Sequence, residues 1–312
     1  MRKGDPVGRD VEDDLGLIAV TPDVVYGHKL GMALTLDQYR PADANGAGVM
    51  FINSGGFESG KLTQYQETAP GRFRLLGPRE LTVEGAEEPI PLLSQFSFAP
   101  LLEKGFTVFD VRHGSSPRFT LDEMVKDVRR AVRFVRCQAD HLGVDPQRLG
   151  VWGASAGGYL AIFLALSSDA GSADSTDPVE RTSSHIQAAA TYYAAGYDFA
   201  ADAEGFPEVI ENLPALKIGM EKLRDLSIKR FITAAAPPVL TVYGTDDFPF
   251  ITGACEAIHR GLQAAGATSK LVPLEGTGHE FAGDDGFHEH HAQRAMHEVV
   301  AWFERWLIVD GS

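Results

Sequence analysis

The chain has 312 residues, of which 44% are apolar and 23% are charged, and this composition excludes a disordered protein. A chain of this length buries enough apolar surface to fold without disulfides or a structural metal. Its 43 Asp and Glu residues outnumber its 28 Lys and Arg residues, giving a formal net charge of −15 that argues against nucleic-acid and peripheral membrane binding.

The cysteines and the N-terminal residues argue against a disulfide framework, a zinc site and a signal peptide. Cys137 and Cys255 are too few for a disulfide framework and too far apart in the sequence for a zinc site. The first 22 residues form a polar N-terminal extension without the apolar segment of a signal peptide, and no apolar run approaches 18 residues. The sequence therefore predicts a cytoplasmic protein with no membrane span, although a chain from which a leader had been removed would look the same.

The N-terminal part of the chain predicts strands followed by an insertion. Residues 24–30 and 32–39 alternate apolar and polar side chains around Gly31, which indicates an antiparallel pair. Residues 48–53 form a short apolar run that ends in a Gly-rich loop, as a buried third strand would. Residues 57–95 lack either period and are rich in Pro and Gly, so we expect a lid-like insertion.

Four aromatic residues in and just after this insertion leave two roles open. They either line a substrate pocket or anchor the insertion to the body of the protein. They are Tyr65, Phe73, Phe96 and Phe98.

The remaining chain alternates strands and helices. Thr120 and Glu123 form a capping box before apolar residues at spacings of three and four, which predicts a helix ending near Gly143. We expect further strands over residues 106–111, 149–153, 186–193, 238–243 and 269–273. We expect further helices from residue 156 and over residues 216–225, 251–265 and 288–307, with an irregular acidic stretch over residues 197–215.

This order predicts an α/β fold. Its features are a mostly parallel central sheet, an antiparallel N-terminal strand pair, helices on both faces and a lid-like insertion after strand 3. We expect a single domain over residues 1–312, in which residues 57–95 and a cap-like segment over residues 196–230 cover the body.

A candidate nucleophile follows the strand over residues 149–153. Gly153-Ala154-Ser155-Ala156-Gly157 matches the pattern G-x-S-x-G and lies between a predicted strand and a predicted helix. The flanking glycines allow the close packing that such a tight turn requires, and the helix N-terminus places main-chain N–H groups beside Ser155. Without this context Ser155 would be read as a helix N-cap residue.

A serine hydroxyl needs a base and a carboxylate to become a nucleophile, in the chain order serine, acid, histidine for this kind of turn. Asp246 and Asp247 follow the next-to-last strand, and His279 follows the last strand in Gly276-Thr-Gly-His279. Each lies on a Gly-rich loop at the carboxyl end of a strand, where open α/β sheets place their sites.

These segments resemble the α/β-hydrolases, and within them the esterase and lipase branch with a Gly-rich oxyanion loop. The resemblance rests on VDPQRLGVWGASAGGYLA, YGTDDFPF and GTGHEF, and it extends from about residue 24 to residue 308, apart from residues 57–95. It implies a catalytic triad of Ser155, Asp247 and His279, with Asp247 favoured over Asp246 by its spacing from Gly244.

The resemblance also implies an oxyanion hole. The family pattern His-Gly-Gly-Gly-aromatic is replaced here by Asn53-Ser54-Gly55-Gly56-Phe57. The expected donors are the N–H groups of Gly55, Gly56 and Ala156, with Phe57 beside them in the substrate-binding region. Asn53 replaces the usual histidine and is expected to hydrogen-bond within the loop.

The sequence thus predicts a serine hydrolase of carboxylic esters that acts on a small-molecule substrate and requires no cofactor or metal. His288, His290, His291 and His297 lack a metal-ligand spacing and are interpreted as an exposed polar face. The alternatives are a deacetylase or feruloyl esterase of plant polysaccharide, a prolyl-oligopeptidase-like peptidase and an inactive binding module. The peptidase is disfavoured because the residues before the first strand are too few for a propeller.

Overall fold

The computed structural model describes residues 18–69, 72–86 and 88–308. A central sheet of eight strands runs through the molecule in the order β1-β2-β8-β3-β9-β10-β11-β12. Strand β2 is antiparallel to β1 and to β8, and the other neighbours are parallel. The strands are β1 (Ile18–Lys29), β2 (Met32–Pro41), β3 (Gly48–Ile52), β8 (Thr107–Val111), β9 (Leu149–Ala154), β10 (Ala188–Tyr192), β11 (Val239–Gly244) and β12 (Ser269–Leu274).

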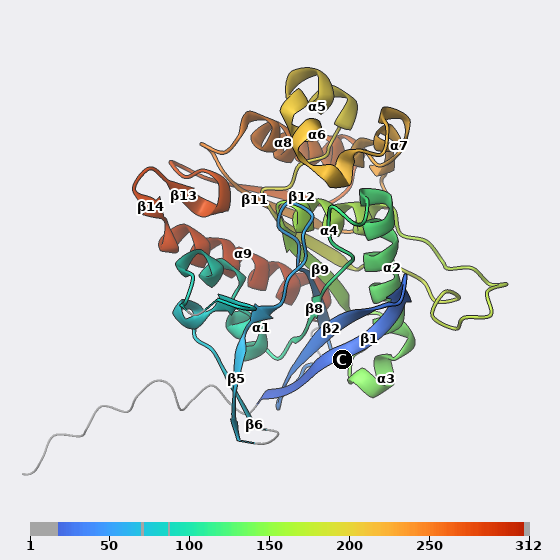
Figure 1. Cartoon of the computed structure of the whole chain (residues 1–312), viewed down its shortest axis with the longest axis vertical. Coiled ribbons are helices and arrows are strands. Elements are labelled where there is room, and N and C mark those ends of the chain that lie inside the picture. The colour runs from blue at the N-terminus through green and yellow to red at the C-terminus, as the bar shows by residue number, and fades with distance from the viewer. Residues whose placement is uncertain (1–17, 70–71, 87, 309–312) are drawn as a thin grey trace, which may run out of the picture.

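Helices cover both faces of this sheet (Figure 1), as the alternation of strands and helices predicts. A helix can pack on each face because the inner strands are buried on both sides, and all five residues of β3 and of β8 are buried. The longer helices are α2 (Leu121–Cys137), α4 (Ala156–Leu166), α8 (Pro249–Ala264) and α9 (Glu289–Leu307), and α1 (Ala99–Glu103) and α3 (Ala139–Leu142) are short.

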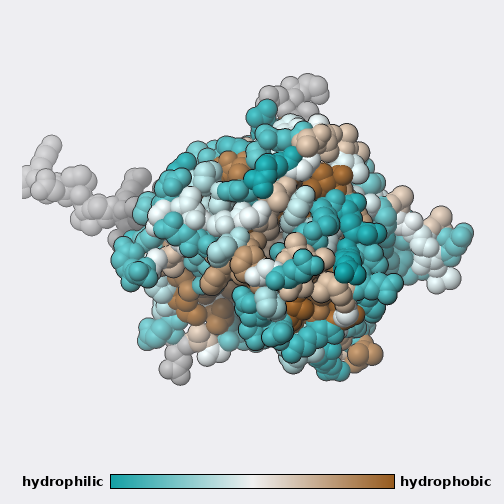
Figure 2. All heavy atoms as spheres, turned by 90° about the horizontal axis from the view of Figure 1, so that it is seen from above, coloured by the Kyte–Doolittle hydropathy of each residue, from teal (hydrophilic) through white to brown (hydrophobic). Residues whose placement is uncertain are grey.

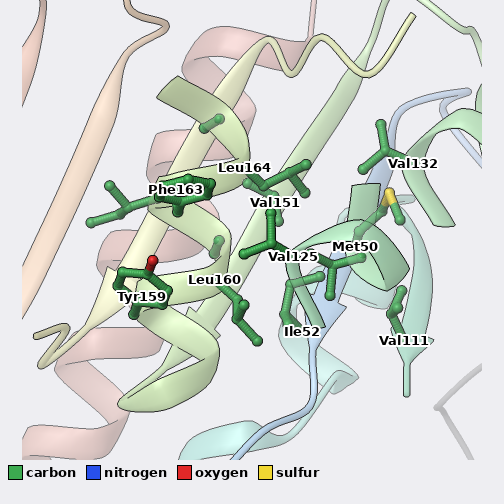
Figure 3. Close-up of a cluster of buried hydrophobic side chains, with 14 of the residues drawn as sticks. Met50, Ile52, Val111, Val125, Val132, Val151, Tyr159, Leu160, Phe163 and Leu164 are labelled. Carbon is green, nitrogen blue, oxygen red and sulfur yellow. The ribbon is translucent and has the colours of Figure 1, made fainter. Parts of the chain in front are cut away.

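Two hydrophobic clusters occupy the two sides of the sheet. In β3, Met50 and Ile52 belong to one cluster, whereas Val49 and Phe51 belong to the other, because successive side chains of a strand point to opposite faces. Figure 3 shows part of the first cluster, where side chains of α2 and α4 pack against the sheet. These residues include Val125, Val132, Leu160, Leu164, Met50, Ile52 and Val151.

The helix predicted to end near Gly143 is interrupted. Gln138 leaves the helical conformation with φ −105° and ψ 17°, so α2 ends at Cys137 and the short α3 follows. Gly143 then terminates α3 with φ 69°, the left-handed conformation that glycine adopts at helix ends.

The insertion after β3 contains more regular structure than its sequence indicates. Strands β5 and β6 form an antiparallel hairpin, which Figure 1 shows at the opposite end of the molecule from α5–α7. Short strands β4 and β7 pair nearer the sheet. The elements are β4 (Leu62–Thr63), β5 (Tyr65–Ala69), β6 (Arg72–Leu75), β7 (Thr82–Val83) and the 3-10 helices η2 (Pro78–Glu80) and η3 (Pro91–Phe96).

Helices also replace the irregular acidic stretch expected over residues 197–215. Asp198 accepts a hydrogen bond from the N–H of Ala200 and so caps α5, and Pro207 begins α6 at a position that tolerates proline. This cap segment contains α5 (Phe199–Gly205), α6 (Pro207–Asn212), η4 (Pro214–Leu216), α7 (Met220–Asp225) and η5 (Ile228–Phe231).

Figure 2 views the molecule from the side of the cap segment and shows apolar patches separated by polar side chains. Two short strands, β13 (Ala282–Gly283) and β14 (Gly286–Phe287), follow the 3-10 helix η6 (His279–Phe281) before α9. Among the described residues, no helix combines the length and the apolar character needed to cross a membrane.

Candidate active site

Ser155 lies in the turn between β9 and α4, as the sequence predicts. Its φ of 51° and ψ of −120° are an unusual conformation for a residue other than glycine, and they mark the strained turn expected of a nucleophile. Two glycines make the turn possible. A Cβ atom at Gly153 would lie 2.4 Å from the main-chain oxygen of Gly157, and one at Gly157 would lie 2.3 Å from that of Ile52.

Ser155, His279 and Asp247 form a continuous chain of hydrogen bonds. The Nε2 atom of His279 lies 3.2 Å from the Oγ of Ser155, and its Nδ1 atom lies 3.0 Å from both carboxyl oxygens of Asp247. Because a carboxylate only accepts hydrogen bonds, Nδ1 carries the proton and Nε2 is free to accept the serine proton. The structure therefore brings together three residues predicted from three separate strand ends.

The two neighbouring aspartates differ in their surroundings. The Asp247 side chain is fully buried, and its Oδ1 also accepts the N–H of Phe248 at 2.7 Å. Asp246 instead accepts a hydrogen bond from the hydroxyl of Thr245 at 3.1 Å. Asp247 is thus the aspartate that is hydrogen-bonded to His279, and Asp246 is a turn residue.

The imidazole of His279 packs between two aromatic rings that were not among the site residues predicted from the sequence. The ring of Tyr193 lies 4.6 Å from it and that of Phe248 lies 5.6 Å from it, centroid to centroid. The hydroxyl of Tyr193 donates to the Oε1 of Gln95 at 2.6 Å, which ties this ring to the insertion. Tyr193 directly follows β10, so its place at a strand end was the available signal.

The oxyanion loop departs from the prediction at Gly55. Its N–H donates to the main-chain oxygen of Glu58 at 2.9 Å, and the N–H of Glu58 donates back to Gly55 at 2.9 Å. Gly56 and Phe57 between them have φ of 56° and 68°, so the four residues form a tight two-residue turn. The prediction of Gly55 as an oxyanion donor is wrong in this conformation, because the turn already uses that N–H group.

The other two predicted donors remain available. Within the described residues, the N–H groups of Gly56 and Ala156 make no hydrogen bond to the protein, and both residues line the same cavity as Ser155. Ala156 is the first residue of α4, where the helix leaves its N–H groups unpaired. An anion formed beside Ser155 would therefore meet two main-chain donors.

Asn53 supports this loop as expected. Its Nδ2 atom donates to the main-chain oxygen of Gly60 at 2.7 Å and to Oδ1 of Asp110 at 3.2 Å. Asp110 is completely buried, and burial raises the pKa of this carboxyl to about 7. Asn53 thus joins the loop to a residue of β8.

Two cavities meet at Ser155. The cap cavity, of about 310 Å³, lies against the cap segment, and its lining includes Phe57, Ala156, Tyr159, Phe199, Phe250 and His279. The insertion cavity, of about 250 Å³, is bordered by the insertion, and its lining includes Asn53, Glu58, Leu93, Phe96 and Tyr193. Each covering segment therefore forms walls beside the nucleophile.

The four aromatic residues in and just after the insertion divide between the two roles considered. Phe96 lines the insertion cavity, whereas Phe98 is fully buried against Tyr39, Phe51 and Trp152. Tyr65 and Phe73 pack edge-to-face on each other, and Tyr65 also contacts Tyr39. Phe96 therefore faces the site, and the other three anchor the insertion.

The C-terminal histidines lie outside the triad. The Nδ1 atom of His288 lies 2.9 Å from the hydroxyl of Thr277, and its Nε2 atom lies 2.7 Å from Oδ1 of Asp285. This histidine thereby supports the loop that carries His279. Within the described ranges, no three His, Cys, Asp or Glu side chains come together to hold a metal ion.

Similar proteins of known sequence are ester hydrolases. The chain is 28% identical over 192 residues to the probable carboxylic ester hydrolase LipM of Mycobacterium tuberculosis, covering 58% of this chain and 42% of LipM. It is 29% identical over 216 residues to the esterase LipQ of the same organism, covering 64% of this chain and 48% of LipQ. The chain thus spans less than half the length of these relatives.

Solved structures with the same fold include ester hydrolases. Esterase 2 of Thermogutta terrifontis phosphorylated by paraoxon has a TM-score of 0.65 at 19% identity, covering 98% of this chain and 100% of that one. The acetyl ester-xyloside bifunctional hydrolase of Caldicellulosiruptor lactoaceticus has a TM-score of 0.69 at 18% identity, covering 94% and 98%. Together with the sheet order, they confirm the predicted α/β-hydrolase fold.

Family models match both the nucleophile and the histidine segments. The model of the dienelactone hydrolase family matches residues 223–307, which include Asp247 and His279. The model of the BD-FAE family matches residues 93–252, which is just over half of the chain and includes Ser155 and Asp247. The chain belongs to the BD-FAE family of α/β-hydrolases.

Proposed function

We propose that the protein is a serine hydrolase that cleaves carboxylic esters through an acyl-enzyme intermediate. The observation that carries this proposal is the hydrogen-bonded chain from Ser155 through His279 to the buried Asp247. The ester-hydrolase names of the relatives and the family membership support it.

In the first half of the reaction, Nε2 of His279 takes the proton of Ser155 as its Oγ attacks the ester carbonyl carbon. The carbonyl oxygen becomes an oxyanion, which the N–H groups of Gly56 and Ala156 stabilise. Donors of this kind each contribute about 3–4 kcal/mol to the stability of the transition state. The imidazolium then protonates the leaving alcohol, and the acyl group stays on Ser155.

In the second half, water replaces the alcohol. His279 takes a proton from the water, which attacks the acyl carbonyl, and then returns that proton to Oγ as the carboxylic acid leaves. Asp247 holds the imidazole in one tautomer and stabilises its charged form throughout. Every step uses residues of this chain, so the proposal includes no cofactor or metal.

The two cavities suggest short substrates. Ligand pockets commonly have volumes of about 300–1,000 Å³, and the cap and insertion cavities lie at or below the lower end of that range. We therefore propose that the cap segment and the insertion restrict the site to esters with small acyl and alcohol groups.

A panel of p-nitrophenyl esters from acetate to palmitate tests both parts of the proposal, with a feruloyl ester and an acetylated sugar added. We expect kcat/KM to be largest for short acyl chains and to fall steeply toward palmitate, with activity lost in Ser155→Ala. Wild-type protein that hydrolyses no member of the panel would contradict the esterase proposal. Activity that increases toward palmitate would contradict only the size argument.

A further inference from the structure

The cap cavity contains two acidic residues, Asp202 and Glu280, among largely apolar walls. Asp202 of α5 lines it together with Val209, Leu213 and Leu216 of the same cap segment. Neither the cap cavity nor the insertion cavity has a Lys or Arg among its described lining residues. A ligand that enters the cap cavity therefore meets the carboxyl groups of Asp202 and Glu280 and no basic side chain except His279.

Asp202 has no partner of its own among the described residues. Its N–H continues α5 by donating to the oxygen of Asp198, but its carboxyl group makes no hydrogen bond or ion pair there. The nearby Lys229 is already paired with Asp198. Partial burial, and secondarily the charge of Asp198, raise the pKa of Asp202 to about 7. A positive group in the cavity would therefore stabilise the ionised carboxylate.

Aromatic rings line the same cavity and add a second attraction for positive charge. The face of an aromatic ring carries negative electrostatic potential, and a cation over it is stabilised most strongly when water is excluded. These rings come from the oxyanion loop, α4, the cap segment, the loop after β11 and the first turn of α8. They are Phe57, Tyr159, Phe199, Phe248 and Phe250.

A carboxylate combined with aromatic walls is the chemistry that recognises an ammonium group. We infer that the cap cavity binds esters that carry an ammonium group in the half of the substrate lying there, and that Asp202 determines this preference. The inference rests on the esterase activity proposed above and names a substrate class for it. An ester that carries a free carboxylate group elsewhere in the molecule would be repelled from the same cavity.

Two pairs of substrates test the preference, one for each half of the ester. Acetylthiocholine is compared with 3,3-dimethylbutyl thioacetate, its neutral isostere in the alcohol half. The p-nitrophenyl ester of 6-(trimethylammonio)hexanoate is compared with that of 7,7-dimethyloctanoate, its neutral isostere in the acyl half. We expect the cationic member of one pair to have a kcat/KM at least tenfold higher at pH 8, and that pair identifies the half that enters the cap cavity.

Variants assign the preference to Asp202. In Asp202→Asn, which keeps the shape of the side chain, the preference should fall about tenfold, mainly through KM. Glu204→Gln is the matched control, because Glu204 lies on the same helix, is exposed and does not line the cavity. Retention of the cation preference in Asp202→Asn would overturn the assignment, as would its equal loss in Glu204→Gln.

The pH dependence gives a second readout. The preference should increase from pH 6 to pH 8 as Asp202 ionises, and it should be independent of pH in Asp202→Asn. Other charged groups near the cavity are Asp198 with its partner Lys229, and His279 with Glu280 across the site. A change in the triad itself affects the rate for both members of a pair, so the ratio of the two rates is unaffected by it.

Failure of this inference can be distinguished from failure of the esterase proposal. If the neutral esters are hydrolysed and neither cationic member is preferred, the esterase stands and the inference is wrong. Calorimetric binding of hexyltrimethylammonium to Ser155→Ala tests the cavity without catalysis. Binding that weakens about tenfold in Ser155→Ala/Asp202→Asn supports the inference, and absence of binding overturns it whatever the hydrolysis assays show.

Discussion

The side chain of Asn53 donates a hydrogen bond to the main-chain oxygen of Gly60 at 2.7 Å and so closes the loop that contains Gly56. The second bond of its Nδ2 atom reaches Asp110, a fully buried residue of β8. The position of the Gly56 N–H group therefore depends on a side chain that is hydrogen-bonded to the central sheet.

Replacing Asn53 by alanine is expected to lower kcat about tenfold and to leave KM nearly unchanged. Complete loss of an oxyanion donor lowers kcat roughly 100- to 1,000-fold, and a donor that is only less well positioned should have a smaller effect. Steady-state kinetics with a short p-nitrophenyl ester measure both constants.

Asn45→Ala is the matched control for this prediction. Asn45 also bonds to main-chain groups, donating to Lys104 and accepting from Ala47, but it does not line either cavity beside Ser155. Its replacement should affect stability without lowering kcat. Equal kcat values for the two variants would contradict a positioning role for Asn53.

The glycine at position 157 is expected to contribute strongly to stability. In Gly157→Ala the new Cβ atom would lie 2.3 Å from the oxygen of Ile52, a main-chain atom in the central sheet that cannot move aside. We expect a loss of about 1–3 kcal/mol or more in the free energy of unfolding. Urea denaturation followed by circular dichroism measures this loss.

Gly253 offers a comparison at a site without such crowding. It lies exposed inside α8, and a Cβ atom there would meet nothing within 4 Å. Gly253→Ala should therefore stabilise the protein by up to about 1 kcal/mol through its higher helix propensity. Similar unfolding midpoints for the two variants would refute the steric argument.

The neighbouring aspartates should respond very differently to the same substitution. In Asp247→Asn the amide no longer holds the correct imidazole tautomer, and kcat is expected to fall by roughly 10,000-fold. Asp246→Asn should keep activity within about threefold, because the Asp246 side chain is hydrogen-bonded to Thr245, whereas the His279 ring is hydrogen-bonded to Asp247 and Ser155. Active-site concentrations determined by titration ensure that the comparison reflects turnover, and the opposite ranking of the two variants would rule out Asp247 as the orienting acid.

The two cysteines should differ in their reactivity toward thiol reagents. Cys255 is fully buried, and burial raises the pKa of its thiol well above the ordinary value, so little reactive thiolate forms. Cys137 is only half-buried. In the native protein, Ellman's reagent should label Cys137 first and leave Cys255 unmodified until urea unfolds the chain. Rapid labelling of Cys255 under native conditions would show that this part of the core opens readily.

The sequence predicts the candidate residues Ser155 and His279 because each lies in a recognisable local pattern. Ser155 has glycines two residues away on either side and a buried strand before it, and His279 follows the last strand in a Gly-rich loop. The sheet then brings them together, since the carboxyl ends of its parallel strands lie at one edge.

The features of the site that local sequence patterns do not predict depend on loop conformation and on contacts between separate segments. The use of the Gly55 N–H group by Glu58 follows from the conformation of a turn with two positive φ angles, and one of these belongs to Phe57, a residue not typical of that turn. Asp202 lies in a short helix 47 positions after Ser155, and no periodic pattern links it to the cap cavity.

The activation of Ser155 by His279 is the central claim, and covalent labelling tests it most directly. Native protein is incubated with a fluorophosphonate probe, its intact mass is measured, and the modified peptide is mapped by tandem mass spectrometry. We expect one adduct per chain, located on Ser155, absent from Ser155→Ala and formed much more slowly in His279→Ala. A wild-type chain that acquires no adduct, or acquires it on another residue, would contradict the assignment of Ser155 as the nucleophile.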